Sequence, residues 1–172
     1  MKKTLYAVGT GTFLVVFPAA SFLFGMVIHE SSHAIICLSL GLPYSWSLTQ
    51  VVYLTSSDPL VNTVVRLAGG AGQALFSFAS FCLVTLFEKR IQRSFLIESQ
   101  RALGLGVVFG IEIALLTVAF HGIANGIWEG LFYPHYSQNY NNNLWTAVIL
   151  LPSLLPSSYI VFQRCKLVTT PE

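Results

Sequence analysis

Two histidines and a glutamate occur together near the start of the chain, in the segment His29-Glu30-Ser31-Ser32-His33. Residues four apart lie on the same face of a helix, so both imidazoles can reach one metal ion. Zinc binds neutral imidazole nitrogen and lowers the pKa of a coordinated water to about 7. The glutamate beside the first histidine can then accept a proton from that water. The pattern therefore predicts a zinc site with Glu30 as general base.

The surroundings of this motif are apolar. Of the 172 residues, 54% are hydrophobic and only 9% are charged, and the formal net charge is +2. Soluble domains carry about 25% charged residues, so the composition argues against a soluble enzyme and against a nucleic-acid-binding protein. Ionisable groups inside a bilayer cost several kcal/mol and mark a functional site by default. The three scattered cysteines fit buried thiols better than a metal site.

Four apolar runs are long enough to cross a bilayer core of about 30 Å as helices. They cover residues 5–40, 64–87, 102–132 and 144–163. Residues 44–54 alternate in part between polar and apolar and are rich in β-forming types, which predicts one or two short strands. The expected fold class is an all-α polytopic membrane protein with a short membrane-associated β segment after the first span. We expect a single domain over residues 1–172.

Basic residues are distributed unevenly around these runs. They precede the first run, separate the second from the third and follow the fourth, whereas residues 41–63 and 133–143 contain none. The positive-inside rule therefore predicts that both termini are cytoplasmic. The start of the chain also imitates a signal peptide, but its apolar run continues past any cleavage point. This continuation favours an uncleaved membrane anchor.

The motif and the residues after it resemble the site-2 protease family of intramembrane zinc metalloproteases. The likeness rests on HESSHAIICLSLGLPYSWSL, in which Gly41-Leu42-Pro43 and residues 44–54 take the places of the family's turn and β segment. It covers about residues 12–130. It implies a Zn²⁺-dependent endopeptidase that cleaves a membrane protein substrate in or near a transmembrane segment.

A second stretch resembles the family's Gly-rich polar motif loosely. It reads Arg66-Leu67-Ala68-Gly69-Gly70-Ala71-Gly72-Gln73 and lies at the start of the second core helix. Small residues there let helix backbones approach closely. On this likeness, Gly70 and Gln73 are expected to bind substrate.

The third zinc ligand is where the sequence departs from the family. Members usually have an aspartate in an Asp-Gly pair, and here Asn125-Gly126 stands in that place. Asparagine is an uncommon zinc ligand, so neighbouring residues become candidates. His121, Asn125 and Glu129 are spaced by four and form one stripe on a helix.

Depth in the membrane favours one of these three candidates. Counted from the exterior ends of their runs at residues 40 and 132, His29 and His121 both lie 11 residues deep. Glu129 lies about 12 Å further along the helix than His121 at ~1.5 Å per residue. His121 is therefore predicted as the third ligand and Glu129 as the reserve ligand. Asn125 is predicted to assist catalysis by stabilising the oxyanion or by holding the substrate.

Other functions stay open at this point. A membrane metal- or haem-binding protein, or a metal transporter, also places His and Glu on facing helices without protease activity. The spacing of His121 and Asn125 matches the HxxxN pattern of prenyl-protein-processing proteases, but the paired glutamates of that family are absent from this sequence. The lipid bilayer and a membrane protein substrate are the expected partners, with no nucleic acid. No motif specifies the substrate or the oligomeric state.

Overall fold

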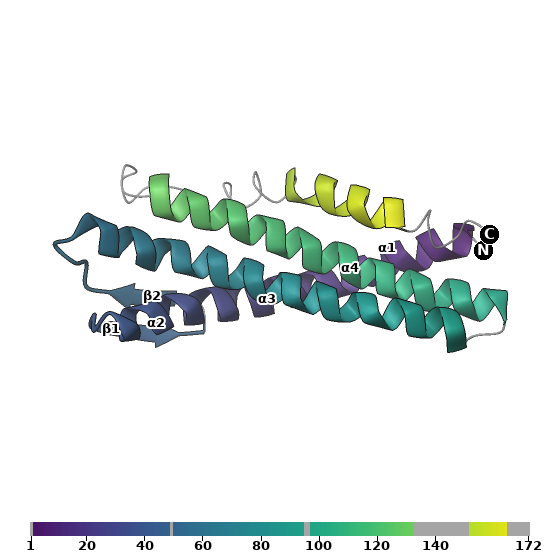
Figure 1. Ribbon diagram of the computed structural model, residues 1–172, viewed down its shortest axis with the longest axis horizontal. Coiled ribbons are helices and arrows are strands. Elements are labelled where there is room, and N and C mark those ends of the chain that lie inside the picture. The colour runs from purple at the N-terminus through teal and green to yellow at the C-terminus, as the bar shows by residue number, and fades with distance from the viewer. Residues whose placement is uncertain (1, 49, 95–96, 133–151, 165–172) are drawn as a thin grey trace.

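Long helices that run alongside one another make up most of the structure, a computed structural model (Figure 1). It describes residues 2–48, 50–94, 97–132 and 152–164. The elements are α1 (Lys2–Phe22), η1 (Leu23–Ile28), α2 (His29–Ser39), β1 (Tyr44–Ser47), β2 (Gln50–Tyr53), α3 (Pro59–Ser94), α4 (Glu98–Ile127) and η2 (Trp128–Phe132). Residues 152–164 form a further helix, which carries no label in Figure 1.

Three of the described helices are long and apolar enough to cross a membrane. They cover Lys3–Ser39, Pro59–Glu88 and Glu98–Phe132. The first three predicted spans therefore correspond to helices of spanning length and apolar composition. The fourth, at 144–163, is helical from residue 152, and its first part lies outside the described residues, as does the predicted loop at 133–143. The cytoplasmic placement of the termini stays a prediction.

The first span is continuous rather than broken before the motif. Segments α1 and α2 are joined by the π-helical turn η1, so His29 begins α2 without an intervening loop. A second π-helical turn, η2, extends α4 and carries Glu129. Single π-helical turns inside α-helices are rare and occur frequently at functional sites. Here one of them precedes the HExxH motif and the other lies at the end of α4.

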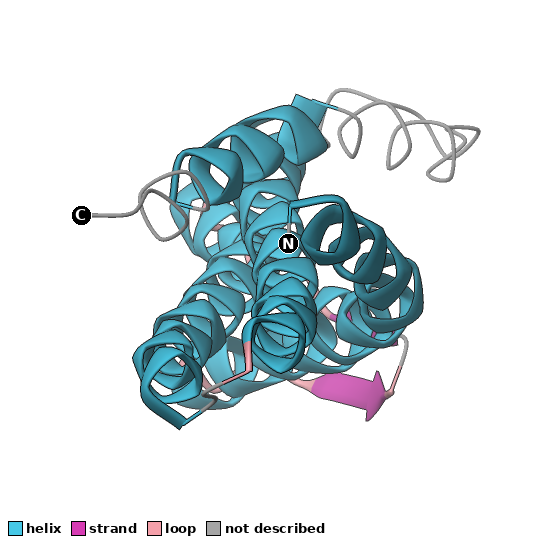
Figure 2. Cartoon of the chain, turned by 90° about the vertical axis from the view of Figure 1, so that its right-hand side faces the viewer, coloured by secondary structure: helices cyan, strands magenta, loops and turns pink. Residues whose placement is uncertain are grey.

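Helix α4 packs against both α1 and α3, and Figure 2 shows the helices clustered in end view. Glycines set the closest contacts. A Cβ added to Gly70 of α3 would lie 2.3 Å from Cα of Gly126 and 2.4 Å from the carbonyl oxygen of Gly122. A Cβ added to Gly110 would lie 2.5 Å from the carbonyl oxygen of Gly9 on α1. Close backbone approach at small residues, which is typical of membrane helices, thus fixes how α4 is aligned with its neighbours.

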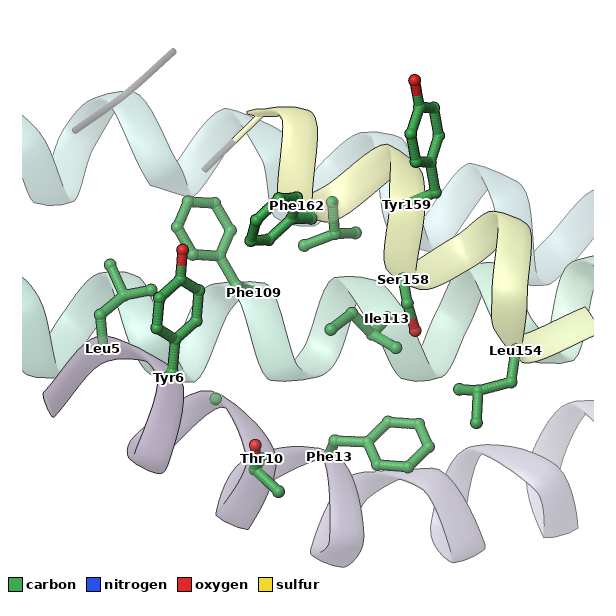
Figure 3. A pocket seen from close by; sticks show the side chains of 12 residues that line it. Leu5, Tyr6, Thr10, Phe13, Phe109, Ile113, Leu154, Ser158, Tyr159 and Phe162 are labelled. Atoms are coloured by element: carbon green, nitrogen blue, oxygen red, sulfur yellow. The ribbon is translucent and has the colours of Figure 1, made fainter. Parts of the chain in front are cut away.

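The C-terminal helix is tied to the bundle by a buried ion cluster. Arg164 pairs with Glu88 near the end of α3, and its Nη1 donates to Oε1 of Glu112 on α4 at 2.8 Å. The Glu112 side chain is fully buried, and its other oxygen has no partner among the described residues. Glu112 is thus a buried acid bonded across helices. A mostly apolar cavity of about 510 Å³ lies beside this helix, between it, α1 and α4 (Figure 3).

The predicted β segment is an antiparallel hairpin. Tyr44 pairs with Tyr53, and Trp46 pairs with Val51. The turn before it begins at Gly41, whose φ of 67° is in the left-handed region that favours glycine. The Gly41 N–H donates to the carbonyl of Leu38, and the next N–H donates to the carbonyl of Cys37. These two bonds form a Schellman motif, which ends α2 and directs the chain into the hairpin.

Candidate metal centre

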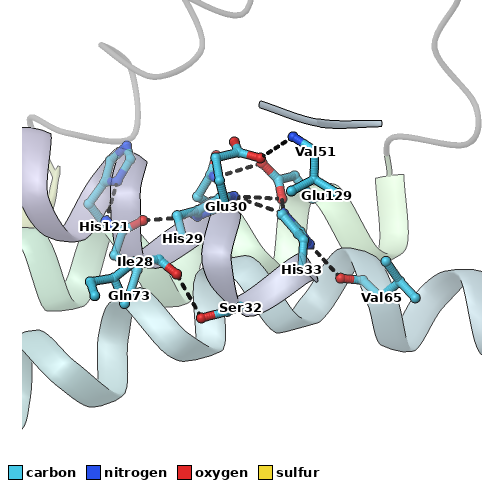
Figure 4. Close-up of polar contacts among 11 residues, drawn as sticks. Ile28, His29, Glu30, Ser32, His33, Val51, Val65, Gln73, His121 and Glu129 are labelled. Atoms are coloured by element: carbon cyan, nitrogen blue, oxygen red, sulfur yellow. Dashed lines mark hydrogen bonds and ion pairs between the residues drawn. The ribbon is translucent and has the colours of Figure 1, made fainter. Parts of the chain in front are cut away.

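Three side chains from two spans converge on one point. Potential ligand atoms of His29, His33 and Glu129 all lie within 4.8 Å of one another. The two histidine Nε2 atoms are 3.1 Å apart, and Oε2 of Glu129 lies 3.2 Å from Nε2 of His29 and 3.4 Å from that of His33 (Figure 4). The two imidazoles are one helical turn apart on α2, as the motif predicts. The carboxylate arrives from η2, nearly a hundred residues later in the sequence.

A hydrogen bond on the far side of the ring fixes the proton of His29. Its Nδ1 lies 3.2 Å from Oε1 of Gln73, whose side-chain nitrogen donates to the carbonyl oxygen of Val118 at 2.9 Å. Because the nitrogen of this amide donates to Val118, its oxygen is the atom that faces His29. Since an amide oxygen only accepts, Nδ1 of His29 must carry the proton. Its Nε2 is then left with a lone pair directed at the centre.

His33 is held in the same tautomer by the backbone of α3. Its Nδ1 lies 2.6 Å from the carbonyl oxygen of Val65, which also only accepts. Two Nε2 lone pairs and a carboxylate oxygen therefore face one another at hydrogen-bond distances. Three closely spaced acceptors with no donor between them repel one another unless a cation or proton lies there. Metal-binding histidines typically donate their second ring nitrogen in this way.

Gly69 allows α3 to approach the two imidazoles closely. A Cβ at this position would lie 2.3 Å from Nε2 of His33 and 2.5 Å from Nε2 of His29. Any side chain there would collide with both rings and displace them. Two histidine nitrogens and a carboxylate oxygen are a donor set that can bind zinc.

Asn125 orients the carboxylate. Its side-chain nitrogen donates to Oε1 of Glu129 at 2.8 Å, which leaves Oε2 for the histidine pair. The sequence predicts Asn125 as a catalytic group, and the structure places it behind Glu129 instead. The exposed fraction of the side chain is 26% for Glu129 but only 5% for His29. The centre is therefore more open on the side of Glu129.

The structure does not bring His121, the predicted third ligand, into this group. Nδ1 of His121 accepts from the side-chain nitrogen of Gln73 at 3.0 Å, and its Nε2 has no partner among the described residues. Counting from the ends of the apolar runs assumes that those ends lie level. The contact of Gly70 with Gly122 and Gly126 sets a different alignment, and Glu129 comes to the histidine pair instead of His121.

The two residues expected to bind substrate are used inside the protein. Gly70 packs against α4, and Gln73 is only 1% exposed, bonded to both His29 and His121. Sequence reasoning missed Gly69 as the residue against which both imidazoles pack. Its place in the Gly-rich stretch was visible, but nothing local showed which glycine faces the histidines.

Glu30, the predicted general base, points toward the hairpin. Its Oε2 accepts a hydrogen bond from the backbone N–H of Val51 on β2 at 2.8 Å (Figure 4). The side chain is half-buried and follows His29 directly in α2. The hairpin is thereby attached to the motif through a carboxylate–amide contact. This contact between Glu30 and β2 could not be read from the spacing of the motif.

No protein-family model matches the chain, and no significant similarity was found to curated proteins or to solved structures. The likeness to site-2 proteases accordingly stays a prediction from the motifs quoted above. The function is argued below from the donor set and its geometry.

Proposed function

We propose that this chain is an intramembrane zinc metalloprotease. The observation that supports it best is the convergence of His29, His33 and Glu129, whose potential ligand atoms lie within 4.8 Å of one another. Two histidines and one glutamate are a ligand set of catalytic zinc sites, which keep one position open for water or substrate. Structural zinc sites are instead closed by four protein ligands. The substrate is a membrane protein, cleaved in or near a transmembrane segment.

Each residue of the centre has a separate role in the proposed reaction. His29, His33 and Glu129 would hold the metal, with Gln73 and the Val65 carbonyl fixing the two imidazoles. A bound zinc ion would supply Lewis acidity, which activates water and polarises a peptide carbonyl. Glu30 takes the proton from the attacking water and passes it to the departing amine nitrogen.

The hairpin gives the substrate a place to bind as an extended chain. A helical substrate buries its carbonyls in its own hydrogen bonds, so it must unwind before attack. Exposed strand edges bind extended peptides by adding a strand. Strand β2 contacts the residue adjacent to His29 through the Val51 N–H. An unwound segment paired with β2 would therefore lie next to the metal centre.

A variant at Glu30 distinguishes this proposal from its main alternative, which is a membrane metal-binding or transport protein without protease activity. We would measure zinc content and cleavage of a fluorescence-quenched transmembrane peptide with the full chain in detergent. Glu30→Gln should keep about one zinc per chain and lose cleavage, since Glu30 is not a ligand. His29→Ala should lose both. Glu98→Gln, at an exposed position at the start of α4, is the matched control and should change neither.

Cleavage that persists in Glu30→Gln would remove Glu30 from the reaction. Zinc binding without cleavage in the wild type would favour the alternative.

A further inference from the structure

Strand β2 has one edge paired with β1 and one edge turned away from it. The Leu54 N–H donates to the carbonyl oxygen of Pro43, so these two residues form a hydrogen-bonded pair. Such pairs alternate along an antiparallel ladder. Val52 therefore bonds to Ser45, whereas the backbone groups of Val51 point away from β1.

The outward N–H of Val51 is the one that binds Glu30, at 2.8 Å from Oε2. The edge of β2 that pairs with no other described strand therefore faces the residue next to His29. An extended chain that adds to this edge needs the Val51 N–H as a donor to its own carbonyl. One N–H cannot serve both acceptors at full strength. Strand addition and the contact with Glu30 thus compete for the same hydrogen.

We propose that the bond between Val51 and Glu30 is a latch that an extended substrate opens. With no substrate, the amide holds one carboxylate oxygen of Glu30 toward β2. A substrate segment that pairs with β2 takes over the N–H and releases this oxygen to accept a proton from water. The inference rests on the proposed protease function and adds its regulation, because the held oxygen of Glu30 is released from β2 when a chain lies in position for cleavage. Hydrolysis of other compounds is thereby slowed while no substrate segment is paired with β2.

Val51→Pro is the direct test, because proline has no N–H. The outward N–H of Val51 takes no part in the hairpin ladder, and proline is tolerated on strand edges. Val51→Ala keeps the N–H and is the matched control. Both variants are assayed as zinc-loaded full chains in detergent. One probe is the quenched transmembrane peptide, and the other is N-acetyl-leucine 4-nitroanilide, which is too short to pair with β2.

The latch predicts different outcomes for the two probes. On the short probe, Val51→Pro should be about tenfold faster than Val51→Ala, a factor that corresponds to ~1.4 kcal/mol. On the long probe it should show no gain, since the peptide opens the latch itself. The proposal is overturned if Val51→Pro is slower on both probes, because the amide would then only align the base. Equal rates on the short probe overturn it as well.

A second measurement does not depend on hydrolysis. Hydrogen exchange of the Val51 amide is followed in metal-free protein with ¹⁵N-labelled valine. Glu30→Ala should accelerate this exchange about tenfold, and adding the long peptide should restore protection, because the peptide becomes the new acceptor. If the peptide leaves the exchange rate of the Val51 amide in Glu30→Ala unchanged, the latch is overturned. If no variant cleaves either probe, the protease proposal fails, and this exchange result still decides whether β2 trades Glu30 for an extended chain.

Discussion

Gly69 lies directly against His33, where a Cβ would be 2.3 Å from the Nε2 atom that faces the centre. The same Cβ would be 2.5 Å from Nε2 of His29. One missing side chain on α3 therefore lets both imidazoles take their positions. The helix that contributes no metal-binding side chain to this group still determines where the two histidine nitrogens lie.

Gly69→Ala should therefore abolish zinc binding while the helices stay folded. The added methyl would collide with Nε2 of both histidines and displace the two rings, and overpacking of this kind costs about 1–3 kcal/mol of unfolding free energy. Zinc content and thermal unfolding in detergent measure the two effects. Gly11→Ala is the matched control, because a Cβ there meets no atom within 4 Å. Full zinc content in Gly69→Ala would place the ion elsewhere.

The third ligand is predicted to be Glu129 rather than His121. Glu129→Ala removes a carboxylate oxygen 3.2 Å from Nε2 of His29 and should empty the site. His121→Ala should keep most of its zinc, because its ring contacts only Gln73 among the groups that orient the centre. Zinc content of the two purified variants decides between them. If His121→Ala loses its zinc and Glu129→Ala keeps it, His121 is the third ligand, as depth in the membrane predicts.

Gln73 should affect zinc affinity without binding the ion. Gln73→Ala removes the acceptor that holds the His29 tautomer. Losing an outer partner of a metal-binding histidine typically lowers affinity about 10- to 100-fold. Competition with a zinc chelator measures this change. Gln73→Glu keeps an acceptor oxygen and should bind zinc more tightly than Gln73→Ala. Equally low zinc affinities of the two variants would count against this role of Gln73.

Arg164 should contribute to stability and not to the metal centre. Arg164→Met leaves the carboxylates of Glu88 and Glu112 without their partner. Removing one member of a buried ion pair typically costs about 3–5 kcal/mol. Thermal unfolding should therefore occur at a lower temperature, while zinc content stays the same. Adding Glu112→Gln to Arg164→Met should recover part of the loss, and an unchanged unfolding temperature in the single variant would show that the cluster is not needed.

The orientation in the membrane can be tested with single cysteines in a background without Cys37, Cys82 and Cys165. Thiols placed within 133–143 should react with a membrane-impermeant reagent added outside, and those within 88–93 should not. This expectation follows from the positive-inside rule. Reversed labelling would invert the topology.

Local features of the protein could be read from the sequence because neighbouring residues decide them. The spacing of His29 and His33 on a helix, the apolar runs and the hairpin after Gly41 depend on periodicity, composition and one left-handed turn. The structure has the helix of the motif, the strands after Gly41 and the first three apolar runs in the predicted places.

Only the tertiary structure decided which groups meet across helices. The choice of Glu129 over His121 depends on how α3 and α4 are aligned, which the contact of Gly70 with Gly126 sets. The bond between Val51 and Glu30 likewise depends on how the hairpin folds back on α2. Alignment between helices comes from interdigitation of surfaces that are distant in sequence. A shift of two helical turns replaces one polar residue by another on the same stripe, and no count of residues from a membrane surface reveals it.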